Sequence, residues 1–244
     1  MTDRIRPGRY RLRMHRIQLR AGRLTLRPMT ESDWEVLLAW NNDPDVLRFA
    51  EAGDITSWTL PAMQAMYRGV SRRGHCFIIE LDGRPIGEAW LQKMNLPRVL
   101  DAYPEQHVRR IDLAIGAKEL WGQGWGSKAI RLLVRLAFDH LGVDLLYEPE
   151  IADTNPRSRR AFEKNGFAVV AEIPQAPGAK FSVGYDMALT RADYERRQAT
   201  HPRNGRRTSG SPGPVSQGRA RRSKSRMRER DERLRLTEDN EGES

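Results

Sequence analysis

The sequence predicts an α/β domain with a mixed β-sheet, and three features of the 244-residue chain support this prediction. Short segments that alternate apolar and polar residues recur along the chain, between segments in which apolar residues have helical spacing. Asp82-Gly83 is the turn most typical of a hairpin. The clearest amphipathic helix lies between two strand patterns. A hairpin combined with a strand–helix–strand order predicts a sheet of mixed direction.

In the N-terminal half, alternation over Arg23–Arg27 predicts the first strand. Thr30 and Asp33 resemble a capping box, with Asp in place of Glu, and open a helix that runs through about Asn42. The elements that follow are a helix from about Pro61 to Ser71, with Thr59 or Leu60 near its start, and strands over His75–Leu81, Pro85–Gln92 and Val108–Ile115.

In the C-terminal half, the helix predicted over about Gly126–Leu141 has the most regular pattern. Its apolar residues recur at i, i+3, i+4, i+7, i+8 and i+11, and charged residues lie on the other side. Asn155 and Pro156 are residues that start helices, and Asn165-Gly166 is a typical helix end. The remaining predicted strands cover Asp144–Tyr147, 167–173 and 180–189.

The formal net charge of +10 lies entirely at the two ends of the chain. Residues 1–16 contain six Arg and one Asp, and residues 201–244 contain twelve Lys or Arg and seven Asp or Glu. Residues 17–200 contain 24 basic and 24 acidic residues and are therefore neutral. The central region thus lacks the basic character that a groove-binding nucleic-acid domain needs.

Three regions follow from composition. Residues 17–195 contain the periodic segments and are predicted to form the folded domain. Residues 1–16 show no apolar period, and form either a basic N-terminal extension or, because Met14 is an equally good start codon, sequence upstream of the true start. Residues 196–244 are rich in Arg, Ser, Gly and Pro and then acidic residues, which predicts a disordered charged tail.

Several classes of protein are excluded by composition. The single cysteine, Cys76, rules out an intramolecular disulfide and a multi-cysteine zinc site, and its apolar strand indicates a buried small side chain. The histidines have no metal-ligand spacing. No apolar run reaches the ~18 residues of a membrane span. The Arg-rich start lacks the apolar core of a secretory signal, so we expect a cytoplasmic protein.

The segment Leu120–Ser127 has three glycines at alternate positions immediately before the strongest helix. Glycines allow a tight turn that brings consecutive backbone N–H groups to one point, and a helix start adds unpaired donors and a positive dipole end. These features suit the pyrophosphate of a cofactor. By itself the pattern also fits an ordinary glycine-rich turn, and it matches neither a Walker loop nor a dinucleotide fingerprint.

The order of elements around this loop resembles the GNAT acetyltransferase superfamily over roughly residues 20–192. The most specific matches are the glycine loop and the pattern from Asn155 to Phe162-Glu163-Lys164-Asn165-Gly166-Phe167. Within the superfamily, the segment Leu26–Thr30 and Arg110-Ile111-Asp112 are similar to the aminoglycoside 6′-N-acetyltransferases. The Trp-Gly-x-Gly-x-Gly run at 121–126 is equally similar to the branch that acetylates the N-termini of ribosomal proteins.

The resemblance implies acetyl-CoA as the donor and no metal. It implies that the loop holds the pyrophosphate, that the strand around Asp112 pairs with the pantetheine arm, and that a backbone N–H there polarises the thioester carbonyl. The cofactor-binding residues that it implies are Leu113, Ile115, Gly122, Gln123, Gly124, Trp125, Gly126, Ser127 and Asn155.

For the chemistry, the resemblance implies that Asp112 is the general base that takes the proton of the attacking amine. The alternative is an exposed strand carboxylate paired with Arg109 or Arg110. The resemblance implies that Glu150 binds the acceptor, and its neighbours Asp153 and Glu148 are alternatives for this role. The other interpretation is that these residues only belong to a solvated loop. Glu51 is a further candidate, although Arg48, three residues before it, opposes the binding of a polycation.

Two features depart from the pattern. The segment Val46–Glu51 stands where aminoglycoside acetyltransferases typically have paired tryptophans near the acceptor. Many members of the superfamily have a tyrosine, proposed to protonate the leaving thiolate, where this chain has Phe162. Phe162 is expected to pack in the core, because phenylalanine has no proton to donate.

These observations predict an N-acetyltransferase that acts on a primary amine of a small polyamine such as an aminoglycoside, which would make it an antibiotic-resistance enzyme. The alternatives are a protein N-terminus or a siderophore amine as acceptor. A different class, a CoA-binding, nucleic-acid-associated protein that acts through its basic ends, is also considered. We expect a monomer or a homodimer.

Overall fold

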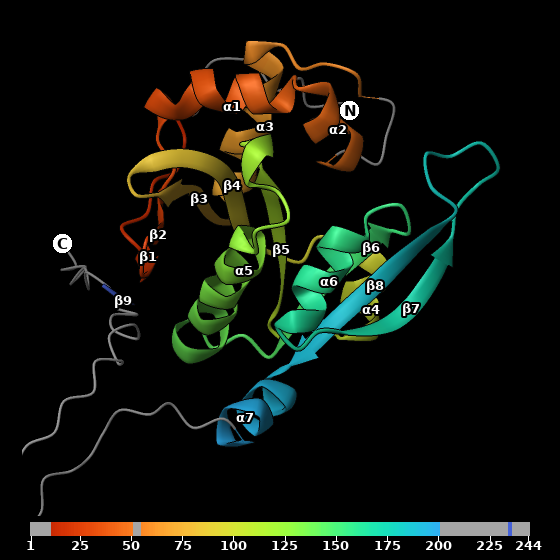
Figure 1. The fold of residues 1–244 in the computed structure, drawn as a ribbon. Coiled ribbons are helices and arrows are strands. Elements are labelled where there is room, and N and C mark those ends of the chain that lie inside the picture. The colour runs from red at the N-terminus through yellow and green to blue at the C-terminus, as the bar shows by residue number, and fades with distance from the viewer. Residues whose placement is uncertain (1–10, 51–54, 201–233, 236–244) are drawn as a thin grey trace, which may run out of the picture.

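The computed structural model describes residues 11–50, 55–200 and 234–235, and Figure 1 shows how they are arranged. The strands are β1 (Gln18–Ala21), β2 (Leu24–Pro28), β3 (Gly74–Leu81), β4 (Arg84–Lys93), β5 (Val108–Ile115), β6 (Leu145–Ala152), β7 (Ala168–Pro174), β8 (Val183–Thr190) and the two-residue β9 (Leu234–Arg235). The helices are α1 (Trp34–Asn41), α2 (Pro44–Ala50), α3 (Leu60–Ser71), α4 (Pro97–Ala102), α5 (Trp125–Arg135), α6 (Pro156–Lys164) and α7 (Arg191–Thr200).

The strands form one mixed sheet in the order β7-β8-β6-β5-β4-β3-β2-β1, with β9 beyond β1. Among the described strands, β5 and β6 are the parallel pair and the other neighbours are antiparallel. The predicted hairpin joins β3 to β4, and Asp82 and Gly83 have φ values of 51° and 83°. Positive φ at both central residues is typical of type I′ hairpin turns, whose backbone twist matches the twist of the two strands that they join.

Helices cover both faces of the sheet (Figure 1). Successive side chains of β3 point to opposite faces, so Phe77 and Ile79 pack with the apolar face of α5, while Cys76 and Ile78 pack with α1 and α3. The α5 side contains the larger hydrophobic cluster. Cys76 is buried, as predicted. No helix in the part of the chain that the structure describes could cross a membrane.

The helix ends follow the predicted rules. The Asp33 carboxylate accepts the backbone N–H of Thr30 at 2.8 Å, which closes the capping box before α1. The Asn155 side chain accepts the N–H of Ser158 at the start of α6, and Gly166 follows that helix with a φ of 98°. The helix predicted over 126–141 begins at Trp125 and continues after Arg135 as a wider turn, over Leu136–His140, of π-helical hydrogen bonding.

Five elements, β1, α2, α4, α7 and the two-residue β9, have no counterpart in the sequence prediction. The first three have only four to seven residues, too few for a periodic pattern to be visible. In α7 the buried side chain is Tyr194, so this helix also lacks an apolar stripe. It continues to Thr200, five residues past the predicted end of the domain at 195.

The described part of the predicted N-terminal extension packs against the domain. The side chain of Leu12 is buried in the α1 and α3 cluster, and its backbone N–H donates to Glu31 at 3.0 Å. The N–H of Arg13 donates to the hydroxyl of Ser71 at 3.0 Å. Residues 11–13 are therefore held to the same layer as α3. Residues 1–10 of the extension, and residues 201–233 and 236–244 of the tail, lie outside the described residues.

The parallel strands β5 and β6 separate soon after they begin. Their paired residues are Val108 with Leu145 and Arg109 with Leu146. On its other edge, β5 remains paired with β4 as far as Ile115 opposite Gly87. The C-terminal half of β5 therefore faces an opening in the sheet on the β6 side, and this opening positions the site described below.

Candidate active site

The glycine loop enters α5 in a conformation that requires glycine. Gly122 and Gly124 have φ values of 75° and 82°, in the left-handed region where side chains other than glycine are strained. Gly124 is the N-cap, and Lys128 donates its N–H back to the Gly124 carbonyl at 3.1 Å. The N–H groups of the three residues between them have no partner in the helix, as in any first turn. The loop thus presents the anion-binding donors that the glycine spacing predicts.

The start of α5 is held in place by β5 and α6. The indole N–H of Trp121 donates to the carbonyl of Ile115 at 2.6 Å, which ties the loop to the end of β5. A Cβ on Gly126 would lie 3.4 Å from the Leu113 side chain, which is an ordinary van der Waals contact, so the first turn of α5 packs directly on β5. The Asn165 amide donates to the carbonyl and the hydroxyl of Ser127 at 2.9 and 3.1 Å. Sequence reasoning identified Asn165 only as a helix end.

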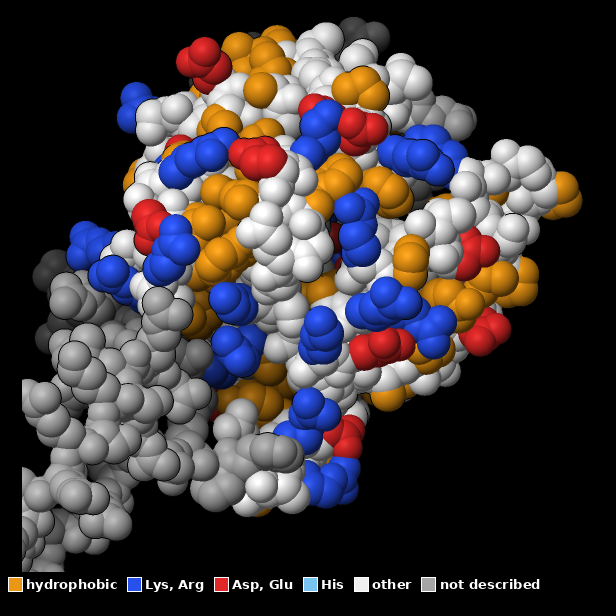
Figure 2. Space-filling view, viewed as in Figure 1, with side chains coloured by type: hydrophobic (Ala, Val, Ile, Leu, Met, Phe, Trp, Pro, Cys, Tyr) orange, Lys and Arg blue, Asp and Glu red, His pale blue; other side chains and the backbone are white. Residues whose placement is uncertain are grey.

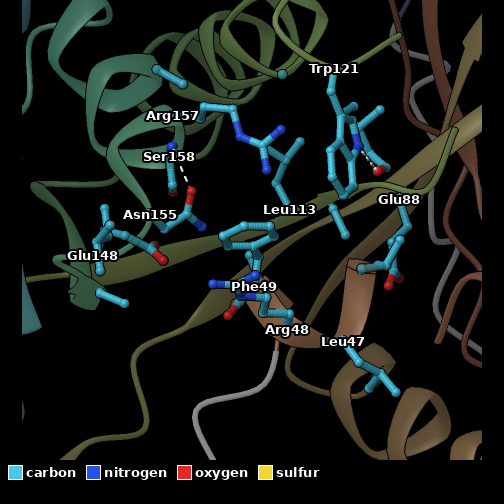
Figure 3. A pocket seen from close by; sticks show the side chains of 18 of the residues that line it. Leu47, Arg48, Phe49, Glu88, Leu113, Trp121, Glu148, Asn155, Arg157 and Ser158 are labelled. Atoms are coloured by element: carbon cyan, nitrogen blue, oxygen red, sulfur yellow. Dashed lines mark hydrogen bonds between the residues drawn. The ribbon is translucent and has the colours of Figure 1, made fainter. Parts of the chain in front are cut away.

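A cleft of about 1120 Å³ occupies the opening between β5 and β6. Its walls come from the glycine loop, α6, α2, the middle of β4 and the C-terminal parts of β5 and β6 (Figure 3). On the α6 side the cleft is lined by Arg157, Arg160 and Lys164. Figure 2 shows Lys and Arg side chains gathered over α5 and α6 on this face of the molecule. The positive charges beside the glycine loop suit a phosphorylated ligand.

Asp112 lies in the floor of the cleft, and both of its oxygens accept hydrogen bonds. The Gln92 amide donates to one oxygen at 2.7 Å, and the Arg110 guanidinium donates to the other. Burial by itself lowers the pKa of Arg110, but the carboxylates of Asp112 and Glu148 raise that pKa above its ordinary value. Arg110 therefore stays charged beside Asp112. The ion pair between Asp112 and Arg110, which the sequence analysis gave as an alternative to catalysis, is present. Asp112 nevertheless lines the cleft.

Glu148 is the second carboxylate of the cleft. The strand predicted over Asp144–Tyr147 extends instead to Ala152, so Glu148 lies within β6, next to a break in its pairing with β8. Its side chain lines the cleft and points toward the centre in Figure 3. The residue is 8% exposed, and its Oε2 has no hydrogen-bond partner among the described residues. Burial, followed by the charge of Asp112, raises its pKa well above the ordinary value for glutamate.

Glu150, the carboxylate preferred from the sequence, is bound to an arginine. Arg98 donates to its side chain at 3.0 Å, and its backbone has a φ of 54°. The Glu150 N–H donates to Asp186 at 2.8 Å, and the fully buried Asp186 also accepts hydrogen bonds from Tyr147 and Arg98. Glu148 and Glu150 both line the cleft: the Glu150 side chain is partly exposed and paired with Arg98, whereas the buried Oε2 of Glu148 has no hydrogen-bond partner among the described residues.

Glu88 is the third carboxylate, and it was missed from the sequence. It lies on β4, lines the cleft and is mostly buried. The Tyr67 hydroxyl donates to its Oε1 at 2.6 Å, and the Trp90 indole donates to its Oε2 at 2.8 Å. An acidic residue within an otherwise apolar strand was the signal that could have identified it.

A cation and two aromatic rings join opposite sides of the cleft. The guanidinium carbon of Arg157 lies 4.3 Å from the ring centre of Trp121 and 4.8 Å from that of Phe49. The two rings contact each other edge to face, with their centres 6.0 Å apart. Figure 3 shows Arg157 above Phe49 and beside Trp121. Arg157 and Phe49 were not identified from the sequence, because the interaction joins α6, α2 and the loop.

The remaining predicted residues fall in different places. Leu113, Ile115, Trp125 and Asn155 line the cleft, together with the glycines and Ser127. The Gln123 side chain donates to the carbonyl of Glu119 at 2.9 Å and does not line the cleft, and neither does Asp153. Glu51 lies outside the described residues. Phe162 is buried against Phe167, as predicted. No three His, Cys, Asp or Glu side chains in the described ranges form a metal site.

Comparisons with known proteins agree with this geometry. The family model described as an acetyltransferase (GNAT) domain matches residues 23–168, so the chain belongs to the GNAT acetyltransferase family. It has the GNAT fold and is an acetyl-CoA-dependent N-acetyltransferase. The sequence prediction of fold and enzyme class is confirmed.

The relatives indicate a branch of the family. The chain is 29% identical over 180 residues to the aminoglycoside N(6′)-acetyltransferase type 1 of Klebsiella pneumoniae, which covers 71% of this chain and 86% of the relative. A solved structure of AAC(6′)-Ib in complex with ribostamycin and coenzyme A is 28% identical, with a TM-score of 0.57 over 71% of this chain and 96% of the other. The chain also shares its fold with a spermidine N-acetyltransferase from Vibrio cholerae. The two are 19% identical, with a TM-score of 0.59 over 72% of this chain and 99% of the other.

Proposed function

We propose that the protein acetylates a primary amine of a small polycationic acceptor, of the aminoglycoside or polyamine kind. The observation that carries this proposal is the set of three carboxylates, Glu88, Asp112 and Glu148, in the wall of one cleft next to an anion-binding loop. Carboxylates in a partly desolvated cleft attract cationic groups and bind ammonium ions in preference to neutral molecules. The similarity to aminoglycoside acetyltransferases supports the same class of acceptor.

The residues of the loop and of β5 fit the cofactor. The N–H groups of Trp125, Gly126 and Ser127 would hold the pyrophosphate, and Arg157, Arg160 and Lys164 add positive charge there. The unpaired edge of β5, at Leu113 and Ile115, would hydrogen bond the pantetheine arm. Asn155 lines the same part of the cleft. Acetyl-CoA supplies the acetyl group as a thioester.

Asp112 is proposed as the group that accepts the proton of the amine. Arg110 and Gln92 orient its carboxylate, so that an ammonium ion entering the cleft finds an acceptor of fixed position. We propose that Glu148, rather than Glu150 or Asp153, is the neighbouring carboxylate that binds the acceptor. Its partnerless oxygen gains a charge-assisted hydrogen bond when an ammonium group arrives.

The test is an assay of thiol release by the purified protein with acetyl-CoA and four acceptors: ribostamycin, spermidine, a peptide with a free N-terminus, and a hydroxylamine. We expect turnover with ribostamycin or spermidine and much less with the other two. Preferential turnover of the peptide or of the hydroxylamine would contradict the acceptor class. Tight CoA binding without turnover of any amine, combined with salt-dependent nucleic-acid binding that is lost on deleting residues 201–244, would favour the CoA-binding class instead.

A further inference from the structure

We propose that Asp186 of β8 is a positioning residue, which holds a bulge in β6 so that Glu148 points into the cleft. This inference rests on the proposed function, in which Glu148 binds the acceptor, and it specifies what keeps that side chain in place. Asp186 is fully buried and does not line the cleft, so it acts only through the backbone of β6.

The pairing of β6 with β8 contains one extra residue on β6. Glu148 is paired with Met187, and Ile151 is paired with Tyr185. The two residues between Glu148 and Ile151 therefore face a single residue of β8, Asp186, which defines a β-bulge. Bulges redirect the side chains beside them and are common next to active sites.

The bulge changes which side chains of β6 share a face. Leu146 and Ile151 both belong to the hydrophobic cluster on the α5 side, although they are five residues apart. In a regular strand, residues separated by an odd number point to opposite faces. The extra residue therefore allows both side chains to reach the core while Glu148, between them, lines the cleft. A hydrogen bond from the backbone of Ile111 on β5 reaches Glu148 across the opening of the sheet.

The two residues of the bulge do not suit a regular strand. Pro149 has no N–H to donate to a neighbouring strand, and Glu150 has a φ of 54°, in the left-handed region. The N–H of Glu150 donates to the side chain of Asp186 at 2.8 Å. A Cβ on Gly184 would lie 3.1 Å from the Cα of Glu150, so glycine leaves room for the bulge. Asp186 thus supplies the hydrogen-bond partner that the displaced backbone needs.

The Asp186 carboxylate is itself fixed by two further donors. Tyr147 donates its hydroxyl at 2.6 Å, and Arg98 of α4 donates to both carboxylate oxygens. Burial by itself raises the pKa of Asp186, but the hydrogen bonds from Arg98 and Tyr147 lower this pKa below its ordinary value. Asp186 therefore remains ionised at neutral pH, and the hydrogen bond that it accepts from Glu150 is charge-assisted.

The test is a double-mutant cycle of Asp186→Asn and Glu148→Gln, with kcat, the acceptor KM and the acetyl-CoA dissociation constant measured for each protein. The acceptor is ribostamycin, or spermidine if ribostamycin is not a substrate. Asp186→Asn should raise the acceptor KM by about tenfold, because Glu148 is no longer placed to hydrogen bond a charged group. The values of kcat and of the acetyl-CoA dissociation constant should stay within about threefold, since Asp112 and the glycine loop are unchanged. In a protein that carries Glu148→Gln, adding Asp186→Asn should change the acceptor KM by less than about twofold.

Two substitutions of Glu150 separate the effect of its backbone from that of its side chain. Glu150→Gly removes the carboxylate and suits a positive φ, so the acceptor KM should stay within about threefold of the unmodified protein. Glu150→Val places a β-branched residue at this φ and should raise the acceptor KM as Asp186→Asn does. Asp82→Val is the matched control, since it introduces valine at a φ of 51° in the hairpin between β3 and β4, away from the cleft. It should leave the acceptor KM unchanged.

Thermal melting shows whether Asp186→Asn is folded. If it is not, Arg98→Gln replaces it in the cycle, because the Arg98 side chain is 39% exposed and the buried carboxylate is kept; the same pattern with a smaller rise in KM is expected. Additive effects in the cycle, an equal loss of acetyl-CoA affinity, or equal losses in Glu150→Gly and Glu150→Val would overturn the positioning role. If the unmodified protein acetylates neither ribostamycin nor spermidine, the proposed function fails and the acceptor role of Glu148 fails with it, which is a different result.

Discussion

The two halves of the cleft are built in different ways. The cofactor half consists of backbone groups and glycines from one continuous stretch, with Gly122, Gly124 and Gly126 leading into α5. The acceptor half consists of side chains from three strands, Glu88 on β4, Asp112 on β5 and Glu148 on β6. A backbone site is determined by local conformation, whereas a side-chain site depends on which strands the fold places next to each other.

One contact joins the two halves. Phe49 of α2 belongs to the acceptor side, Trp121 belongs to the glycine loop, and Arg157 packs on both rings. Because the contact is made of exposed and half-buried side chains, it can adjust without disturbing either half. If the halves work separately, variants on one side should change the binding of one ligand only.

The largest expected effect is on the acceptor side. Asp112→Asn keeps the shape of the side chain and removes the basic carboxylate, so kcat should fall by about 10²- to 10⁴-fold. The acetyl-CoA dissociation constant should change little, because the glycine loop is untouched. Steady-state kinetics measures kcat, and calorimetric titration measures the dissociation constant of acetyl-CoA. Full kcat in the variant would remove Asp112 as the proton acceptor.

The second effect is on the cofactor side. Gly124→Val places a β-branched residue at a φ of 82°, so the loop must change conformation and the acetyl-CoA dissociation constant should rise by at least about tenfold. Gly178→Val is the matched control, since it introduces similar strain at a φ of 88° in the loop between β7 and β8. Calorimetry should show weaker CoA binding for the first variant alone. Equal losses in both would mean that the effect is general destabilisation.

The third effect is a pH dependence that belongs to Glu148. Burial and Asp112 raise its pKa, so it becomes ionised only as the pH rises well above the ordinary range of glutamate. The KM for a cationic acceptor should therefore fall as the pH rises through this window, and Glu148→Gln should lose that fall. The titration of the amine affects the unmodified protein and Glu148→Gln equally, so it cancels in the ratio of their KM values. Superimposable KM profiles would contradict the role of Glu148.

The same raised pKa affects stability. The folded protein retains a proton that the unfolded chain releases between the ordinary and the raised pKa of Glu148. The free energy of unfolding should therefore decrease as the pH rises through this window, and Glu148→Gln should show a smaller decrease. Urea denaturation of both proteins at several pH values measures this free energy of unfolding.

The smallest effect concerns the contact between the halves. Arg157→Ala removes the cation from Phe49 and Trp121, and the KM values for acetyl-CoA and for the acceptor should both rise by about two- to fivefold. Arg159→Ala is the control on the same helix, because Arg159 packs on Tyr185 instead and does not line the cleft. A change in one KM alone would assign Arg157 to one half.

Local patterns predicted most of the elements that position the cleft. The hairpin at Asp82-Gly83, the capping residues Thr30 and Asn155, and the amphipathic α5 were all predicted, because each depends on residues close together in the chain. The short α2 was not predicted, and with it Phe49 was missed as a cleft residue. The extension of β6 to Ala152 was also missed, so Glu148 and Glu150 were expected in a loop.

The sequence by itself determined the fold class, the glycine loop, the family and Asp112 as a candidate base. The glycine loop depends on residue spacing within one segment, the fold class and the family depend on the order of such segments along the chain, and the role of Asp112 follows from the family resemblance. The tertiary structure decided that Glu150 is paired with Arg98 whereas Glu148 has a free oxygen, and that Glu88 shares a face with Asp112. The physical reason is that burial, charge pairing and strand register join residues far apart in the chain, which no local pattern records.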